Sequence, residues 1–231
     1  MADFQNNNSV AQAARVTGNR DVVTLPSYYR WLAEGKIFAA GHGLQDTGID
    51  SQAETTLTPD DVKATFALQS PSAATPLILP LLVKVSWESE GGSATDFQLV
   101  FTKASNLCAT ALAFSGRDML VDNFCTYSAN PVKATPVAQA YYGVATTFLL
   151  TVSALVSADM VMWEYGVAAD NNVVGPLSNS DRVYKANFME EGLPHILTSG
   201  AAMIFYISAT GGDAVIHPYI QWAELEPDDL L

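Results

Sequence analysis

The sequence predicts an all-β protein, an antiparallel β-sandwich with one short helix near its N-terminus. Apolar and polar residues alternate along several segments, which is the pattern of strands that bury one face. The chain is 49% hydrophobic and only 15% charged, so it can form a core, and intrinsic disorder over most of its length is excluded. Turn-forming pairs separate the alternating segments, among them Gly91-Gly92, Asn130-Pro131, Gly175-Pro176 and Gly211-Gly212.

The helix is expected between Pro26 and Gly35. Proline suits the first position of a helix, and glycine suits the residue just after its end. The polar segment 1–20 before it is expected to be a flexible arm. Because Met1–Asn8 has neither a basic region nor an apolar run, we expect no signal peptide.

Strands are predicted where the alternation is clearest. Val83, Val85 and Trp87 share one face of the first such segment, with Lys84 and Ser86 on the other. The same argument predicts five more strands: Phe97 to Phe101, Phe148 to Val156, Val161 to Val167, Met203 to Ile207, and Val215 to Leu225.

Two of these strands carry specific expectations about their faces. In the strand from Val161 to Val167, one face is expected to carry Val161, Trp163, Tyr165 and Val167, with Met162 and Glu164 on the opposite face. In the last strand, Ile220 and Trp222 are expected to point into the core. Pro227 should end this strand, and the acidic residues that follow should be solvated.

The loops between the predicted strands differ greatly in length, which favours Greek-key connections. About eight strands are expected, the number found in a jelly roll. The predicted organisation is therefore a flexible arm (1–20), a single jelly-roll domain (21–225) and an acidic C-terminal tail (226–231).

Three long stretches contain no charged residue: Ala64 to Val83, Ala134 to Ala158, and Gly192 to Gly212. Each is long enough to raise the question of a transmembrane helix. Proline, glycine or threonine interrupts each of them, and the best candidate, the second, has no basic cluster at its flanks. Buried strands explain these stretches better, so no membrane span is predicted.

The formal net charge is −13, from 24 acidic and 11 basic residues. Proteins that bind nucleic acid need clustered Lys and Arg side chains. Here the basic residues are spread singly along the chain, and segment 1–12 contains none. We therefore expect no direct binding to nucleic acid.

No residue pattern specifies a cofactor, a metal site or a catalytic group, so a non-enzymatic protein is expected. Cys108 and Cys125 lack zinc-site spacing and are read as buried thiols, with a single disulfide as the alternative. The histidines also lack metal-ligand spacing. A calcium ion in an inter-strand loop remains an alternative. The residues weighed for these sites are His42, His195, His217, Asp170, Asp181 and the pair Asp60-Asp61.

Two fragments suggest an enzymatic alternative. Asp46-Thr47-Gly48 resembles the catalytic motif of retroviral-type aspartic proteases, and Gly116 to Leu120 resembles a segment nearer the C-terminus of that family. The resemblance implies a dimer in which two Asp46 carboxylates share a proton and activate water. An Asx-type turn is the other interpretation of the tripeptide.

Aromatic residues gather at two places, Tyr28-Tyr29 with Trp31 and Tyr141-Tyr142. Such groups can stack on sugar rings, or they can pack in a core or an oligomer interface. The interface is the favoured interpretation.

The second half of the chain resembles the end of a jelly-roll virion protein. The resemblance lies in the strand Ala202–Ala209, the turn Thr210-Gly211-Gly212-Asp213 and the strand Val215–Leu225. The segment Leu77–Trp87 is similar to an upstream strand of such coats. Tumour-necrosis-factor-like and carbohydrate-binding modules share these features.

This resemblance implies a capsid or capsid-associated subunit of a bacteriophage or related virus. Such a subunit would be made in the host cytoplasm, would form symmetric homo-oligomers with itself and would contact other virion proteins. The alternative is a carbohydrate- or receptor-binding β-sandwich, such as a phage spike or a lectin-like module.

Overall fold

A computed structural model provides the fold. It describes residues 15–16, 22–23, 27–42, 48–50, 52–53, 63–73, 75–90, 94–104, 107, 114–115, 117–123, 136–142, 150–152, 159–170, 183–190, 195–210 and 214–229.

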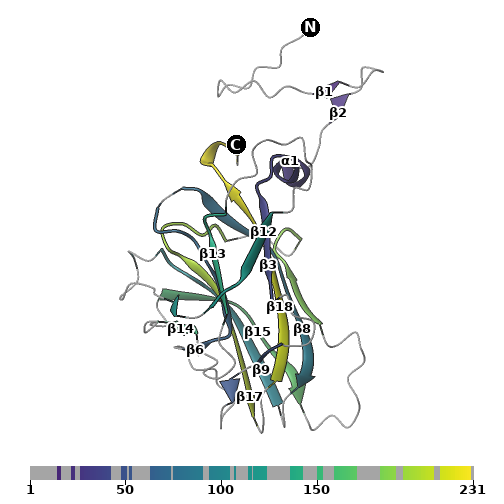
Figure 1. Cartoon of the computed structure of the whole chain (residues 1–231), viewed down its shortest axis with the longest axis vertical. Helices are drawn as coiled ribbons and strands as arrows, with labels where there is room; N and C mark the ends of the chain where they lie inside the picture. The colour runs from purple at the N-terminus through teal and green to yellow at the C-terminus, as the bar shows by residue number, and fades with distance from the viewer. Residues whose placement is uncertain are drawn as a thin grey trace.

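Two largely antiparallel sheets face each other across the core (Figure 1). One sheet has the order β11 (Arg117–Asp118), β13 (Gln139–Tyr142), β7 (Phe66–Gln69), β17 (Ala202–Thr210), β9 (Ala94–Thr102) and β15 (Met160–Asp170), and β5 (Gln52–Ala53) pairs in parallel with β17. The other has the order β12 (Leu120–Asn123), β3 (Ile37–Gly41), β18 (Ala214–Leu225), β8 (Leu77–Glu90) and β16 (Val183–Asn187), and β4 (Ile49–Asp50) pairs with β18. The predicted all-β sandwich is confirmed.

Two small sheets accompany the sandwich. The three-stranded one consists of β10 (Phe114–Ser115), β14 (Leu150–Val152) and β6 (Lys63–Ala64). The two-stranded one pairs β1 (Arg15–Val16) with β2 (Val22–Val23). Most of the predicted arm, and most of the predicted strand from Phe148 to Val156, lies outside the described residues.

Eight strands of the two main sheets form four antiparallel pairs that nest inside one another along the chain. The innermost pair is β9 with β15, followed by β8 with β16, then β7 with β17, and finally β3 with β18. The two members of each pair lie in the same sheet, and the pairs alternate between the sheets. Among these eight strands the polypeptide therefore changes sheet between each strand and the next, except from β9 to β15, which lie in the same sheet.

The core between the sheets follows the predicted alternation. Val83, Val85 and Trp87 are buried there, and Lys84 between them is exposed. Ile220 and Trp222 also point inward, as predicted. Aromatic rings fill the centre, where Phe205 stacks on Phe66 with a centroid separation of 4.8 Å and on Phe97 at 5.6 Å.

A second cluster covers one end of the outer face of the six-stranded sheet. The predicted helix is confirmed as α1 (Ser27–Ala33), and its Trp31 is buried against this face. Gly35 ends the helix with φ of 73°. The Lys36 N–H donates to the Trp31 carbonyl and the Gly35 N–H to the Leu32 carbonyl, a pair of bonds that is typical of a Schellman motif. Trp31 packs with Ile37, Leu79, Leu81, Ala223 and Leu225.

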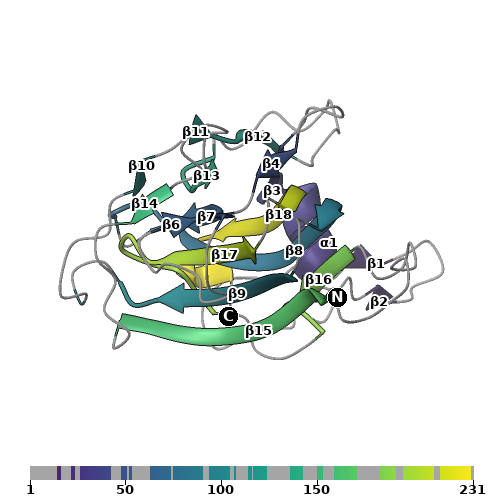
Figure 2. The same ribbon diagram turned by 90° about the horizontal axis from the view of Figure 1, so that it is seen from below.

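Strand β15 differs from the sequence prediction. It lies at the edge of the seven-stranded sheet, with β9 and β17 following it inward (Figure 2). Its register with β9 shifts between Met162 and Glu164, so Val161 pairs with Phe101 and Glu164 with Leu99. Directly paired residues share a face. Val161 and Glu164 therefore lie on the same face, and both are exposed, so the predicted opposite orientation is wrong. A bulge adds one residue and resets the alternation, and it cannot be seen in the pattern of apolar residues.

The first and third uncharged stretches contain buried strands, as expected. The first holds β7 and the start of β8, and the third holds β17, in which every residue except Thr210 is buried. The second holds β13 and β14. In the part of the chain that the structure describes, no helix has the length and apolar character needed to cross a membrane.

Candidate functional site

Mostly polar side chains, together with Val183 and Val215, gather on the outer face of the six-stranded sheet, beyond the end that α1 covers. They occupy the positions between core-facing residues, so they point away from the sandwich. Strand β8 contributes Lys84, Ser86 and Glu88, strand β18 contributes Val215, His217 and Tyr219, and strand β16 contributes Val183 and Lys185.

Two lysines lie side by side on this face. Lys84 of β8 and Lys185 of β16 are directly paired in the register of the two strands, and both side chains are exposed. On its other side Lys84 pairs with Tyr219 of β18. Neither ammonium group forms an ion pair with any residue that the structure describes. Two of only 11 basic residues are thus brought together by the fold, although the sequence spreads them singly.

The same face holds a close contact between a histidine and a carboxylate. His217 of β18 and Glu88 of β8 are 3.0 Å apart, Nε2 to Oε2. Gly48 lies next to them. A Cβ atom at Gly48 would lie 2.3 Å from the Val215 Cγ1 atom and 2.9 Å from the Ile216 carbonyl oxygen. The close packing of the backbone at this point therefore requires glycine.

The acidic C-terminal turn (Pro227–Asp229, the 3₁₀ helix η3) is fixed beside α1. Lys36 Nζ donates to Asp229 Oδ1 at 2.6 Å, and Arg30 Nη2 donates to the Asp229 carbonyl oxygen at 3.0 Å. Partial burial lowers the pKa of Lys36, but hydrogen bonds to Asp229 and Glu34 outweigh this and raise it above its ordinary value. The prediction that the acids after Pro227 are solvated is therefore wrong for Asp229.

Glu224, near the end of β18, is a buried carboxylate. It accepts hydrogen bonds from the backbone N–H groups of Val137 and Ala138, at 3.0 and 2.9 Å, and from Trp222 Nε1 at 3.1 Å. Burial raises the pKa of Glu224, and these hydrogen bonds offset part of the rise. The sequence analysis did not single out this residue, because one acidic side chain at the end of a strand gives no sign of burial.

The other two histidines lie against aromatic rings. His195 stacks on Phe101 with a centroid separation of 4.4 Å, and burial lowers its pKa. The His42 ring lies 5.1 Å from the Tyr142 ring. The described segments contain no group of three or more His, Cys, Asp or Glu side chains that could hold a metal ion.

Several residues weighed from the sequence lie outside the described segments: Asp46, Thr47, Asp60, Asp61, Cys108, Gly116, Cys125 and Asp181. Asp170 is the last residue of β15. Arg117 and Asp118 form β11, which pairs with Tyr142 and Tyr141. The protease, calcium and disulfide alternatives thus stay predictions.

The two aromatic groups are mostly occupied by packing. Trp31 is buried, and the Tyr28 hydroxyl accepts a hydrogen bond from Gln221 Nε2 at 3.0 Å. Tyr141 and Tyr142 are half-buried against the hydrophobic clusters. Of these five rings, Tyr29 is the one that is exposed, at 55%.

Comparison with protein-family models, curated proteins and solved structures found no match to this chain. The strand order and the surface just described are therefore the basis for inferring a function.

Proposed function

We propose that this protein is a virion structural protein, a jelly-roll capsid or capsid-associated subunit that assembles into symmetric oligomers. The nesting of the strand pairs is the observation that carries this proposal. The first of the eight strands pairs with the last, the second with the seventh, the third with the sixth and the fourth with the fifth. Such nesting results when one long antiparallel pair is rolled into two sheets, as in the double Greek key of jelly rolls. Viral capsid domains are a major group with this fold.

The additional strands support the choice of these eight as the framework. Strands β11, β12 and β13 all come from the segment between β9 and β15, and they extend the two sheets beyond β7 and β3. One long insertion thus enlarges both sheets at the same side and leaves the nested order intact, in keeping with the tolerance of loops for insertions.

The charge distribution supports assembly with protein rather than contact with a genome. A net charge of −13 repels a polyphosphate, and the outer face of the six-stranded sheet presents only two lysines among the described residues. In this proposal the genome is neutralised by another component.

Light scattering coupled to size-exclusion chromatography tests the proposal. The purified full-length chain is expected to elute as a discrete multiple of the 24.7 kDa monomer, and negative-stain microscopy is expected to show rings or shells. A protein that stays monomeric over a wide concentration range would disprove assembly.

A carbohydrate- or receptor-binding module is the second candidate, because lectin domains also use jelly rolls. The exposed ring of Tyr29 is the observation that favours it, since an exposed aromatic face can stack on a sugar. Binding on a glycan array that Tyr29→Ala abolishes would support this candidate. An array without any bound glycan would count against it.

A further inference from the structure

The paired lysines on the outer face carry an inference about how copies of the chain meet. Side chains that are directly opposite on neighbouring antiparallel strands have Cβ atoms about 5 Å apart, and like charges at that separation destabilise the sheet. Lys84 and Lys185 occupy such positions. No described carboxylate pairs with either ammonium group. An acidic group from outside the chain would remove this repulsion.

We propose that Lys84 and Lys185 dock the acidic C-terminal turn of a second copy, through its Glu226 and Asp228. This inference depends on the proposed self-assembly and specifies its contact surface. Charge complementarity indicates that the acidic turn is the group that binds the two lysines. Glu226 and Asp228 are exposed, and within the described residues neither side chain has an ion-pair partner.

The acidic turn is held in one shape before any contact forms. The Asp229 N–H donates to the Glu226 carbonyl at 2.9 Å, and the Glu226 N–H donates to Asp229 Oδ2 at 2.8 Å. Lys36 and Arg30 fix Asp229 to α1. The carboxylates of Glu226 and Asp228 are therefore presented on a rigid turn, which lowers the entropy lost when the turn binds.

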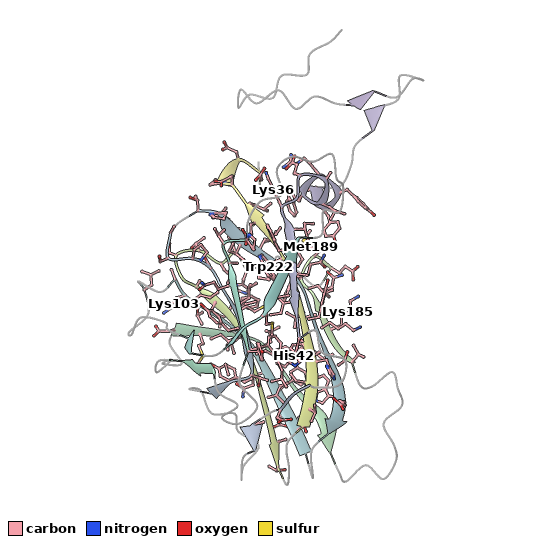
Figure 3. The ribbon with its side chains drawn as sticks, in the orientation of Figure 1. Lys36, His42, Lys103, Lys185, Met189 and Trp222 are labelled. Carbon is pink, nitrogen blue, oxygen red and sulfur yellow. The ribbon has the colours of Figure 1, made fainter. Side chains whose placement is uncertain are left out.

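The lysine pair and the acidic turn lie on different parts of the molecule. Figure 3 shows Lys36, which holds the turn, beside α1 at one end, and Lys185 lower down on the side of the six-stranded sheet. The contact would join two unlike patches, so it is heterologous. A heterologous contact generates a ring when its rotation closes, which is the kind of assembly proposed above.

An apolar neighbour completes the docking surface. Val183 lies on the same face of β16 as Lys185, two residues away, and is 40% exposed. Tyr219, on the other side of Lys84, is half-buried. Burial of the exposed apolar area would add to the attraction of the ion pairs, since interfaces combine an apolar centre with a charged rim.

A charge swap in the full-length chain tests the inference. Lys84→Glu with Lys185→Glu should weaken association about tenfold or more, because like charges then meet. Glu226→Lys with Asp228→Lys should weaken it similarly. A mixture of the two double variants, or one chain carrying all four changes, should recover association. Variants that had simply lost their fold would not recover it. Sedimentation velocity measures the association constants, and thermal unfolding checks that each variant is folded.

Single neutralisations provide a matched control. Lys185→Gln and Lys103→Gln change the net charge equally, and the two lysines lie on opposite sides of the molecule (Figure 3). Lys185→Gln should weaken association several-fold more than Lys103→Gln.

The outcomes separate the inference from the proposed function. A wild-type chain that never associates overturns both. Association that is unchanged by Lys84→Glu with Lys185→Glu overturns the inference alone. The inference is also overturned if the lysine variant loses association but the acidic variant does not, or if the charge swap does not recover association. Either result would show that a different group binds the lysines.

Discussion

At Glu224 a single side chain joins two distant parts of the chain. Its carboxylate satisfies the backbone N–H groups of Val137 and Ala138, just before β13, and the indole N–H of Trp222. Buried polar groups are costly unless they form hydrogen bonds. Glu224 therefore holds the start of β13 against the end of β18 and offsets its own burial.

Removal of this carboxylate should destabilise the protein. We predict that Glu224→Ala lowers the free energy of unfolding at pH 7 by about 2–4 kcal/mol, because three donors lose their acceptor and two of them, the Ala138 N–H and Trp222 Nε1, are buried. Glu224→Gln keeps one acceptor oxygen and should cost less. Urea denaturation measures both values. Equal losses for the two variants would show that the hydrogen bonds contribute little.

The pKa of Glu224 gives a prediction about pH. Because burial raises the folded-state pKa above 4.5, the folded protein binds this proton more tightly than the unfolded chain does. The resulting stabilisation is full below about pH 4.5 and is lost as the pH rises through the folded-state pKa. The stability of wild type relative to Glu224→Gln should thus fall from pH 4 to pH 7, as measured by urea denaturation in a pH series. A difference that stays constant or grows would contradict it.

Gly48 gives a steric prediction at the same scale. An added Cβ would lie 2.3 Å from Val215 Cγ1, so Gly48→Ala should lower the free energy of unfolding by about 1–3 kcal/mol through overpacking. Gly41 is the matched control, since its nearest neighbour would lie at 3.5 Å, an ordinary contact. Thermal unfolding compares the two variants, and a larger loss for Gly41→Ala would contradict the packing argument.

At the scale of elements, helix α1 acts as a cover for one end of the six-stranded sheet. Trp31 is 5% exposed and lies in the hydrophobic cluster on the outer face of the six-stranded sheet, which covers one end of β3, β8 and β18. The cover also fixes the acidic turn, through Arg30 and Lys36. Loss of the helix from the sheet would therefore free the C-terminal turn as well.

Truncation of the Trp31 side chain measures how much the packing of α1 on the sheet contributes to the stability of the protein. We predict that Trp31→Ala lowers the free energy of unfolding by about 3–5 kcal/mol, the usual cost of removing a buried aromatic side chain. Tyr29→Ala, on the exposed side of the same helix, should change it by less than about 1 kcal/mol. Denaturant unfolding would contradict the role of α1 as a cover if the two losses were equal.

Most strands that could be predicted from the sequence have one open face, although β17, which is buried on both faces, was predicted as well. Alternation is visible in β8 from Val83 onward because its outer positions are polar there. Strands β3 and β7 do not alternate, because their outer faces are covered too. Helix α1 covers β3, so Ile37 and Phe38 are both buried. Strand β7 is covered by a separate hydrophobic cluster on the outer face of the seven-stranded sheet, which includes Ala67, Ile204 and Tyr206. Strand β16 is only five residues long, too short for a clear pattern. Neither β3 nor β16 was predicted, and β7 was expected only as part of the buried strands within Ala64 to Val83.

The candidate site depends on strand register, which periodicity does not determine. Lys84 and Lys185 are far apart in the sequence and become neighbours only because β8 pairs with β16 in one particular register. Glu224 likewise finds its donors in residues that precede β13. A single sequence shows which side chains face outward on a strand, but the partners across strands come from the fold.

At the scale of the whole molecule, net charge opposes the proposed assembly. Each chain carries a formal charge of −13, so copies repel one another over distances comparable to the Debye length, which is about 30 Å at 0.01 M salt and about 8 Å at 0.15 M. Oppositely charged groups in direct contact are screened less than charges that are farther apart. The lysine pair would therefore provide a local attraction that persists when the long-range repulsion is screened.

We predict that association of the full-length chain strengthens as ionic strength rises from about 0.01 M to about 0.15 M, because the loss of long-range repulsion outweighs the weakening of a few close ion pairs. Sedimentation velocity at a series of salt concentrations measures the association constant. The variant Lys84→Gln with Lys185→Gln lacks the contact and, with two positive charges fewer than wild type, has a somewhat larger long-range repulsion. Its association should therefore rise with salt in the same direction but stay weaker than wild type throughout. Association that weakens steadily with salt would mean that local attraction, and not the net charge, dominates the encounter of two copies.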